Sequence, residues 1–252
     1  MLINDPGTFF MLLLYRVPAL VFSLCCHEWA HAYVANRCGD PTARLMGRMT
    51  LNPLRHLDPL GAIMMMTVGF GWAKPVPVNP NNYRNRIADD VKVSLAGIAT
   101  NLVLFLLFTA AAVGLNGLLW RADIIAMYGP RLFLSYGGLN LSLVLAGPEL
   151  GMFMRTPALA PVVAFVTVAA QMNLSLAIFN LLPIPPLDGY HVFNDLLLRG
   201  RMNLTPQVAQ MGMLVLLVLS FSTNIIGDVM SFLAGHVQSG VLTVFLKMTG
   251  AQ

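Results

Sequence analysis

Two histidines and a glutamate occur within five residues near the start of the chain. His27, Glu28 and His31 form the pattern H-E-x-x-H in the stretch CCHEWAH. Side chains four residues apart on an α-helix lie on one face, with about 5–6 Å between their Cβ atoms. His27 and His31 can therefore hold one Zn²⁺ from a single helix, and Glu28 beside them can act as general base and acid. The pattern predicts a metal centre with hydrolytic chemistry.

The rarity of these residue types in this chain makes a chance match improbable. The sequence holds only two glutamates, Glu28 and Glu149, and five histidines. The three ionisable groups also lie inside a long apolar segment, where a charged side chain at mid-helix costs roughly 2.5–3.5 kcal/mol on insertion scales. A lone buried histidine is usually a packed core residue, but packing does not offset the cost of three such groups. A bound metal does.

A third metal ligand is needed, because catalytic zinc sites typically use three protein ligands and a water. Asp188 is the candidate that we favour. It follows the stretch NLLPIPPL, whose prolines stop the preceding apolar helix, and Gly189 permits a turn that directs the carboxylate back toward the site. An ordinary solvent-facing Asp-Gly turn is the alternative. His191 and His56 are rival ligands.

The composition places these residues in a membrane protein. Of 252 residues, 57% are hydrophobic and 10% charged, whereas soluble domains have about 45–50% and about 25%. These proportions exclude a disordered chain and most soluble enzymes. The net charge of +4 arises from 15 basic and 11 acidic residues without a basic run, so we expect no nucleic-acid partner. The three clustered cysteines do not indicate a disulfide framework.

Long apolar segments predict the helices that position the candidate residues. Segments at about 8–35, 91–115, 158–182 and 205–222 are apolar, and we predict that each crosses a bilayer core of about 30 Å. The stretches 225–233 and 241–246 are too short to assign. We expect a single all-α domain over 1–252, a bundle of about four to six transmembrane helices. Its catalytic core covers about 8–200 and its C-terminal helices about 205–250.

Four stretches between these spans depart from the helical pattern. Loose alternation over 42–51 predicts a small membrane-associated β element. The apolar stretch 60–72 is too short to span and predicts a re-entrant segment. Prolines make 74–80 extended. We expect 132–146 to be re-entrant or to lie on the outer surface.

Basic residues predict the orientation of the chain in the membrane. By the positive-inside rule, both basic loops face the cytoplasm, so the H-E-x-x-H motif lies near that side. The first loop and the next polar stretch contain, in order, Arg37, Arg44, Arg48, Arg55, Lys74, Arg84, Arg86 and Lys92. Both loops can face the cytoplasm only if 60–72 enters the membrane and returns.

Several motifs together resemble those of the site-2 protease family of intramembrane zinc metalloproteases. The paired signatures are HEWAH in the first span and NLLPIPPLDG at the end of a later one. Further similarities are Asn52-Pro53, the stretch GFGWAKPVPVNP over 69–80, and Gly97-x-x-x-Asn101. These features cover most of residues 20–195. Ile98 departs from the proline that often follows this glycine in the family.

The resemblance implies a short family member without regulatory domains, an enzyme that cleaves peptide bonds within or next to transmembrane segments. It implies one zinc ion per chain, held by His27, His31 and Asp188, with Glu28 as the catalytic base. It also implies polar support near the site from Asn101 and Asn180, which bind either the oxyanion or substrate, or only other helices.

The expected partners are transmembrane protein substrates and the lipid bilayer, and the expected location is a prokaryotic plasma membrane with the site opening toward the cytoplasm. Three other functions are consistent with the same residues. They are a membrane zinc protease with a different third ligand, a metal transporter, and a catalytically silent scaffold that binds transmembrane helices. The sequence does not indicate an oligomeric state.

Overall fold

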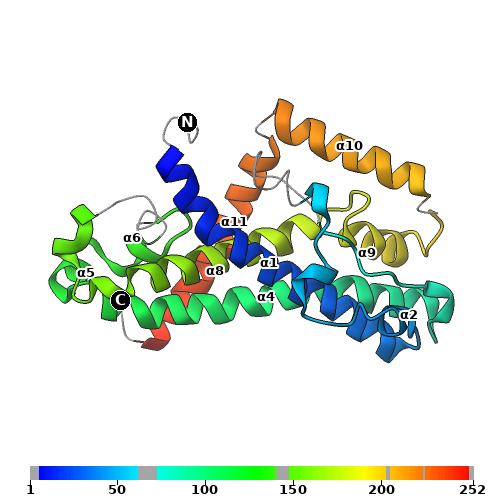
Figure 1. Cartoon of the computed structure of the whole chain (residues 1–252), viewed down its shortest axis with the longest axis horizontal. Coiled ribbons are helices and arrows are strands. Elements are labelled where there is room, and N and C mark those ends of the chain that lie inside the picture. The colour runs from blue at the N-terminus through cyan, green and yellow to red at the C-terminus, as the bar shows by residue number, and fades with distance from the viewer. Residues whose placement is uncertain are drawn as a thin grey trace. The chain divides into compact units, whose positions relative to one another are not determined.

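The computed structural model describes residues 6–61, 73–138, 140, 148–202, 205–223 and 225–249. Four of its helices are long and apolar enough to cross a membrane (Figure 1). They are α1 (Pro6–Cys38), α4 (Arg86–Leu119), α8 (Ala160–Asn180) and α11 (Ile225–Thr249). The first three confirm the spans predicted at 8–35, 91–115 and 158–182. The number of four lies within the predicted range of four to six.

The C-terminal part of the chain differs in detail from the prediction. The span predicted at 205–222 is the helix α10 (Pro206–Ser222), whose 17 residues extend for about 26 Å at the α-helical rise. It is shorter than the four candidate membrane spans and is not one of them. The stretches 225–233 and 241–246, which looked too short to assign, both belong to the 25-residue helix α11. A polar interval between them does not interrupt the helix.

The shorter elements connect these helices. The α-helical ones are α2 (Thr42–Leu45), α5 (Ala122–Tyr128), α6 (Pro130–Leu134) and α9 (Asp188–Leu197). The 3₁₀ turns are η1 (Pro53–Arg55), η2 (Pro80–Asn82), η3 (Pro148–Phe153) and η4 (Pro157–Leu159). Residues 74–79, which lie between η1 and η2, contain no helix or turn, as their prolines predict. The predicted extended stretch 74–80 ends one residue early, because Pro80 begins η2.

The predicted β element at 42–51 is wrong. Thr42–Leu45 is a helical turn, and the residues after it form turns and bends. Asp40 explains the difference, because its carboxylate accepts a hydrogen bond from the backbone N–H of Thr42 at 3.1 Å and so favours a turn over a strand. Within the described ranges there are isolated bridges, Leu57 with Ala73 and Trp120 with Met154, but no strand.

The two predicted re-entrant segments fall largely outside the described residues. Of 60–72, the structure describes only the first two residues, and of 132–146 it describes 132–138 and 140. Both remain predictions.

The chain divides into two compact units. The first, which we call the histidine unit, consists of 21–102 and 175–231. The second, the tryptophan unit, consists of 1–20, 103–174 and 232–252. The predicted single domain stays a prediction.

The tryptophan unit has an apolar core with a buried polar network inside it. The core includes Trp120, Phe133 and Leu242, all almost fully buried. The indole N–H of Trp120 donates to Asn140 Oδ1 at 2.9 Å, and the Asn140 amide donates to Asn116 Oδ1 at 3.0 Å. Buried polar groups are tolerated when they are hydrogen-bonded in this way.

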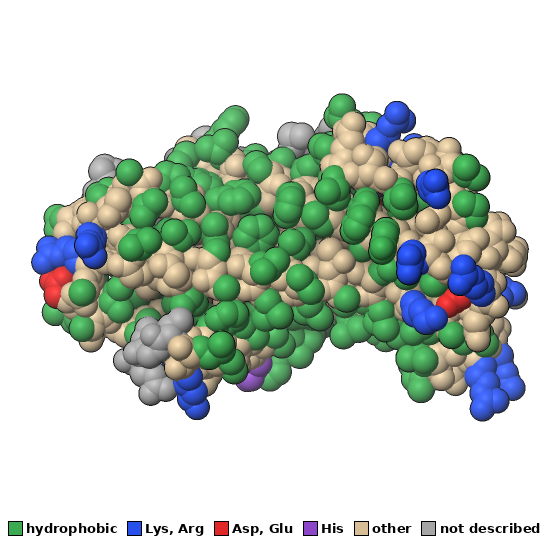
Figure 2. Space-filling model, turned by 90° about the horizontal axis from the view of Figure 1, so that it is seen from below, with side chains coloured by type: hydrophobic (Ala, Val, Ile, Leu, Met, Phe, Trp, Pro, Cys, Tyr) green, Lys and Arg blue, Asp and Glu red, His purple; other side chains and the backbone are tan. Residues whose placement is uncertain are grey.

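The outer surface of the helices is strongly apolar. Figure 2 shows hydrophobic side chains over much of one face of the molecule. Large apolar side chains that point outward from the long helices include Leu107, which is 61% exposed, and Phe232, which is 62% exposed. Exposed apolar side chains on helices of this length are what contact with lipid requires.

Candidate metal centre

Three side chains from two helices of the histidine unit converge on one point. His27 and His31 lie one turn apart on α1, and Asp188 is the first residue of α9. The Nε2 atoms of the two histidines are 3.0 Å apart, and Asp188 Oδ2 lies 3.2 Å from His27 Nε2 and 3.4 Å from His31 Nε2. Among the described residues, this is the group of His, Cys, Asp and Glu side chains that can hold a metal ion.

The distances between the three atoms fit a tetrahedral zinc ion. Zinc bonds of 2.0–2.2 Å to nitrogen and oxygen place neighbouring ligand atoms about 3.3 Å apart. The observed separations of 3.0, 3.2 and 3.4 Å bracket this value. Asp188 Oδ2 is buried and faces the Nε2 atoms of both histidines, so a single cation can bind all three atoms. The donor set therefore suits zinc.

Asp188 is ionised in this environment, as a metal ligand must be. Burial raises the pKa of its carboxyl group, but the proximity of the His31 and His27 rings lowers it by more. The two rings hold the pKa of Asp188 well below its usual range.

A backbone carbonyl of α4 orients His31. His31 Nδ1 lies 2.7 Å from the carbonyl oxygen of Val93. Because a carbonyl oxygen only accepts, Nδ1 must carry the proton, and the lone pair is then on Nε2, the atom that faces Asp188. The backbone thus fixes the tautomer that binds a metal.

Asn101, on the same helix α4, plays the corresponding part for His27. Its amide nitrogen lies 3.2 Å from His27 Nδ1, and its Oδ1, which is buried, has no partner. Turning the amide by 180° about its Cβ–Cγ bond exchanges the two atoms. Oδ1 then accepts from His27 Nδ1–H, and His27 Nε2 is free to bind a metal. We infer that the metal-bound site uses this orientation.

Gly97 provides the space that both histidine rings occupy. A Cβ atom at this position would meet His27 Cε1 at 2.5 Å and His27 Nδ1 at 2.7 Å, and it would also collide with the His31 ring. No side chain larger than hydrogen fits there. The glycine of the Gly97-x-x-x-Asn101 motif is therefore explained by close approach of α1 to α4.

Glu28 contacts the extended segment 74–79 rather than a second side chain. Its Oε2 accepts a hydrogen bond from the backbone N–H of Val76 at 2.7 Å, and the residue is 8% exposed. The segment is held by Arg48, whose guanidinium donates to the carbonyl oxygens of Lys74 and Pro75 at 2.8 and 3.2 Å. Backbone contacts thus determine where the Glu28 carboxylate lies.

The loop between α8 and α9 positions Asp188. Gly189 is required by packing, because a Cβ there would overlap the backbone of Leu181 and Leu182. This reason differs from the flexible turn expected from the sequence. On α10, a Cβ at Gly212 would likewise overlap the backbone of Pro185. Helix α10 therefore supports the proline-rich loop directly.

The other candidate residues make contacts elsewhere. The Asn180 amide donates to the Leu176 carbonyl at 3.0 Å within α8. Of the rival ligands, His191 lies 3.3 Å from Asp90 Oδ2, and His56 Nε2 lies 2.7 Å from the carbonyl of Thr50.

Asp195 of α9 and Asp90 of α4 form a carboxylate pair that the sequence did not indicate. Asp195 is 7% exposed, and its pKa is raised to about 6, first by burial and then by hydrogen bonding to Asp90 and the charge of that group. The available signal was spacing, since Asp195 follows Asp188 by seven residues and so lies on the same face of α9.

The chain is similar along most of its length to a family of peptidases. Residues 15–223 match the family described as "Peptidase family M50". The chain belongs to peptidase family M50. This confirms the resemblance to the site-2 proteases, and with the four apolar helices it identifies an integral membrane metalloprotease. The match includes every residue of the metal centre, and α11 lies beyond it.

Individual relatives agree with the family. The chain is 37% identical to "Putative zinc metalloprotease YwhC" of Bacillus subtilis over 81% of this chain and 79% of that protein. It is 28% and 29% identical to the proteins named "Putative zinc metalloprotease Rip2" of Mycolicibacterium smegmatis and Mycobacterium tuberculosis. The alignments span 63% and 66% of these longer relatives. No solved structure matches the chain significantly.

Gly97→Ala should weaken zinc binding by about tenfold or more, because the added methyl group displaces the histidine rings from their positions. The measurement is the zinc affinity of purified protein by chelator competition. Gly114→Ala on the same helix is the control, since a Cβ there meets nothing within 4 Å. Equal affinities in the two variants would contradict this account of Gly97.

Asp195→Asn should change how stability depends on pH. With a pKa of about 6, native Asp195 keeps a proton that the unfolded chain loses near pH 4. The stability from that proton is complete below pH 4 and is lost as the pH rises through 6. The variant stays neutral at both pH values. The difference in melting temperature, variant minus wild type, should therefore be a few degrees more positive at pH 7 than at pH 4.

The control for this measurement is Asp123→Asn, which removes an exposed acid whose pKa is lowered by its hydrogen bond to Arg121. Its effect should have the opposite sign and be small. An Asp195→Asn curve parallel to that of wild type between pH 4 and 7 would show that Asp195 is not protonated in the fold.

Proposed function

We propose that the chain is an intramembrane zinc endopeptidase that hydrolyses peptide bonds within or next to transmembrane segments of other membrane proteins. The observation that supports this most is the convergence of His27 Nε2, His31 Nε2 and Asp188 Oδ2 at zinc-ligand separations. In our proposal these three atoms hold one zinc ion per chain. The names of the relatives agree with this choice of metal.

The chemistry is divided between the metal and the protein. A bound zinc ion supplies Lewis-acid activation of a carbonyl group and of water. Glu28 takes the proton from the attacking water on its carboxylate and later gives it to the leaving amine. Because Glu28 Oε2 already accepts the Val76 N–H, Oε1 is the atom that carries this proton.

The substrate must be extended at the cleavage point, because a helix buries its peptide bonds in its own hydrogen bonding. Segment 74–79 is extended itself and contacts Glu28 through Val76. We propose that a substrate segment lies along it in an extended conformation, as peptides do when they add to a strand. The stretch 42–51, where we predicted a β element, does not offer a similar edge, because it is helical at its start.

Location and partners complete the proposal. The positive-inside rule places the metal centre toward the cytoplasm, and a prokaryotic plasma membrane is the expected site. The partners are transmembrane substrates, and the process is regulated intramembrane proteolysis. Asn180, which bonds within its own helix in the structure, would have to exchange that bond to contact substrate.

Glu28→Gln should abolish cleavage while zinc remains bound, since the variant keeps all three ligands and loses the proton acceptor. The rate of cleavage of a model transmembrane substrate by purified protein should fall by about 10²–10⁴. Zinc content is matched between samples. Glu149→Gln, at the chain's only other glutamate, is the control and should cleave like wild type.

The same preparation separates the alternatives. Equal cleavage by wild type and Glu28→Gln at matched zinc would refute the mechanism. Unchanged zinc content in Asp188→Ala would indicate a different third ligand. Zinc transport into proteoliposomes without proteolysis would indicate a transporter, and zinc binding without either activity would indicate a scaffold.

Asn101→Ala tests whether Asn101 orients a ligand or contacts the substrate. If it orients His27, zinc affinity should fall about 10–100-fold, and cleavage at saturating zinc should largely recover. Asn101→Asp, which keeps an acceptor for His27 Nδ1–H, should retain most of the affinity. If Asn101 binds the oxyanion instead, zinc affinity should be unchanged, and kcat should fall at saturating zinc.

A further inference from the structure

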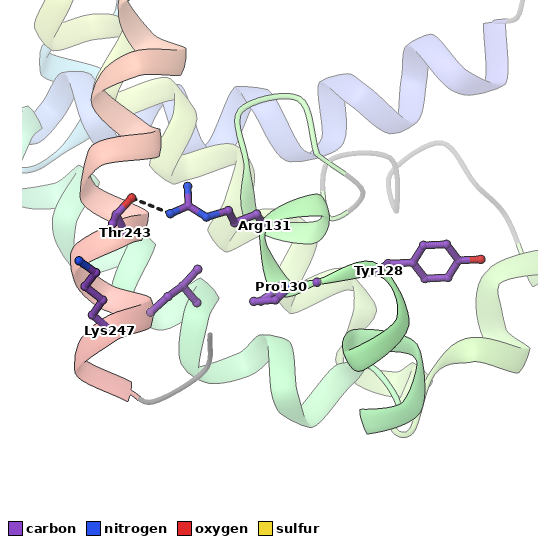
Figure 3. Close-up of a pocket in the computed structure, with 7 residues that line it drawn as sticks. Tyr128, Pro130, Arg131, Thr243 and Lys247 are labelled. Atoms are coloured by element: carbon purple, nitrogen blue, oxygen red, sulfur yellow. Dashed lines mark hydrogen bonds between the residues drawn. The ribbon is translucent and has the colours of Figure 1, made fainter.

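A second site lies in the tryptophan unit. There the C-terminal part of α11 meets the turn between α5 and α6 and encloses a pocket of about 430 Å³ (Figure 3). The lining residues used below are Tyr128, Pro130, Arg131, Thr243, Leu246 and Lys247. None of these residues takes part in the proposed proteolysis.

The pocket carries two positive charges and no negative one. Arg131 and Lys247 line it, and none of its seven lining residues is acidic. Neither cation belongs to an ion pair among the described residues. Both charges are therefore available to an anion.

Arg131 is held in place by neutral groups. Its Nη2 donates to Thr243 Oγ1 at 2.7 Å, and its Nη1 lies 3.4 Å from Ser239 Oγ. Figure 3 shows the Arg131 side chain reaching across to Thr243 on α11. Lys247 follows Thr243 by four residues and so lies on the same face of that helix. Hydroxyl partners orient the guanidinium without neutralising it.

The pocket lies at the C-terminal end of a candidate membrane helix. The candidate span in α11 reaches Met248, so Lys247 is in its last turn. Met127 and Tyr128 on α5 are 71% and 58% exposed, and tyrosine is enriched at the level of the headgroups. The remaining lining from Pro130 and Leu246 is apolar and suits the glycerol and upper acyl region of a lipid.

We infer that this pocket binds the phosphate headgroup of an anionic phospholipid. The guanidinium of Arg131 and the ammonium of Lys247 contact the phosphate, and the apolar lining contacts the tail. Planar guanidinium groups match phosphate oxygens well, and an ammonium group binds the same oxygens as a point charge. The lipid would join α6 to α11, which are far apart in the sequence.

The test is native mass spectrometry of the full chain in detergent, with phosphatidylglycerol, phosphatidylcholine or inorganic phosphate added. Wild type should bind phosphatidylglycerol in preference to phosphatidylcholine. Arg131→Gln/Lys247→Gln should bind phosphatidylglycerol about tenfold or more weakly. The control is Arg44→Gln/Arg155→Gln, which removes two exposed charges outside the pocket and should keep the preference.

Two further variants separate charge from folding. Arg131→Lys/Lys247→Arg keeps both charges, and Thr243→Val removes only the hydroxyl partner, so both should retain the preference for phosphatidylglycerol. An unchanged preference in Arg131→Gln/Lys247→Gln would overturn the proposal, as would equal binding of both lipids by wild type. Displacement of the lipid by millimolar inorganic phosphate would also overturn it, because the ligand would then be a free anion.

Discussion

Three atoms that can bind a metal, His27 Nε2, His31 Nε2 and Asp188 Oδ2, face one another where water is largely excluded, and a cation between them would satisfy all three. Polar groups buried without partners cost free energy, and buried charges cost more. The protein satisfies the outer atoms of the two histidines through Val93 and Asn101, while the inner atoms of the three ligands face one another. The surroundings of His27, His31 and Asp188 are organised around that unsatisfied point.

The three candidate ligands are held in place by different means. His27 and His31 share one helix, so their spacing is determined by helical geometry. Asp188 comes from a different helix and reaches the site only because α8 stops at Asn180 and the proline-rich loop turns back. Close backbone packing at Gly189 and Gly212 fixes that loop. The position of the third ligand thus depends on tertiary packing throughout the histidine unit.

How much of this was predictable depends on whether a feature is local. The H-E-x-x-H motif and the first three spans are local patterns, and the structure contains them as helices. The prediction of a β element at 42–51 was wrong because the weak alternation there competes with a turn in which the Asp40 carboxylate accepts the Thr42 N–H. The continuity of α11 was missed because its polar interval looks like a break. In the fold Gln238 is buried and donates to the Leu134 carbonyl at 2.8 Å, a contact that no local pattern reveals.

Asn101 illustrates the same limit within the site. The motif Gly97-x-x-x-Asn101 marked the residue as important, but sequence alone left it between substrate binding and helix packing. The structure puts its amide against His27 Nδ1 instead, which is a role in orienting a ligand. A spacing of four residues predicts a shared helix face but does not say what that face contacts.

The contacts of α4 show why that face matters. Asp90, Val93, Gly97 and Asn101 follow one another at intervals of three, four and four residues, so they form one stripe along the helix. Val93 and Asn101 contact the two histidines, and Gly97 leaves room for them. Asp90 contacts His191 on α9, the helix that begins with Asp188. Helix α4 therefore contacts both elements that carry the candidate ligands, and it helps to set their relative position.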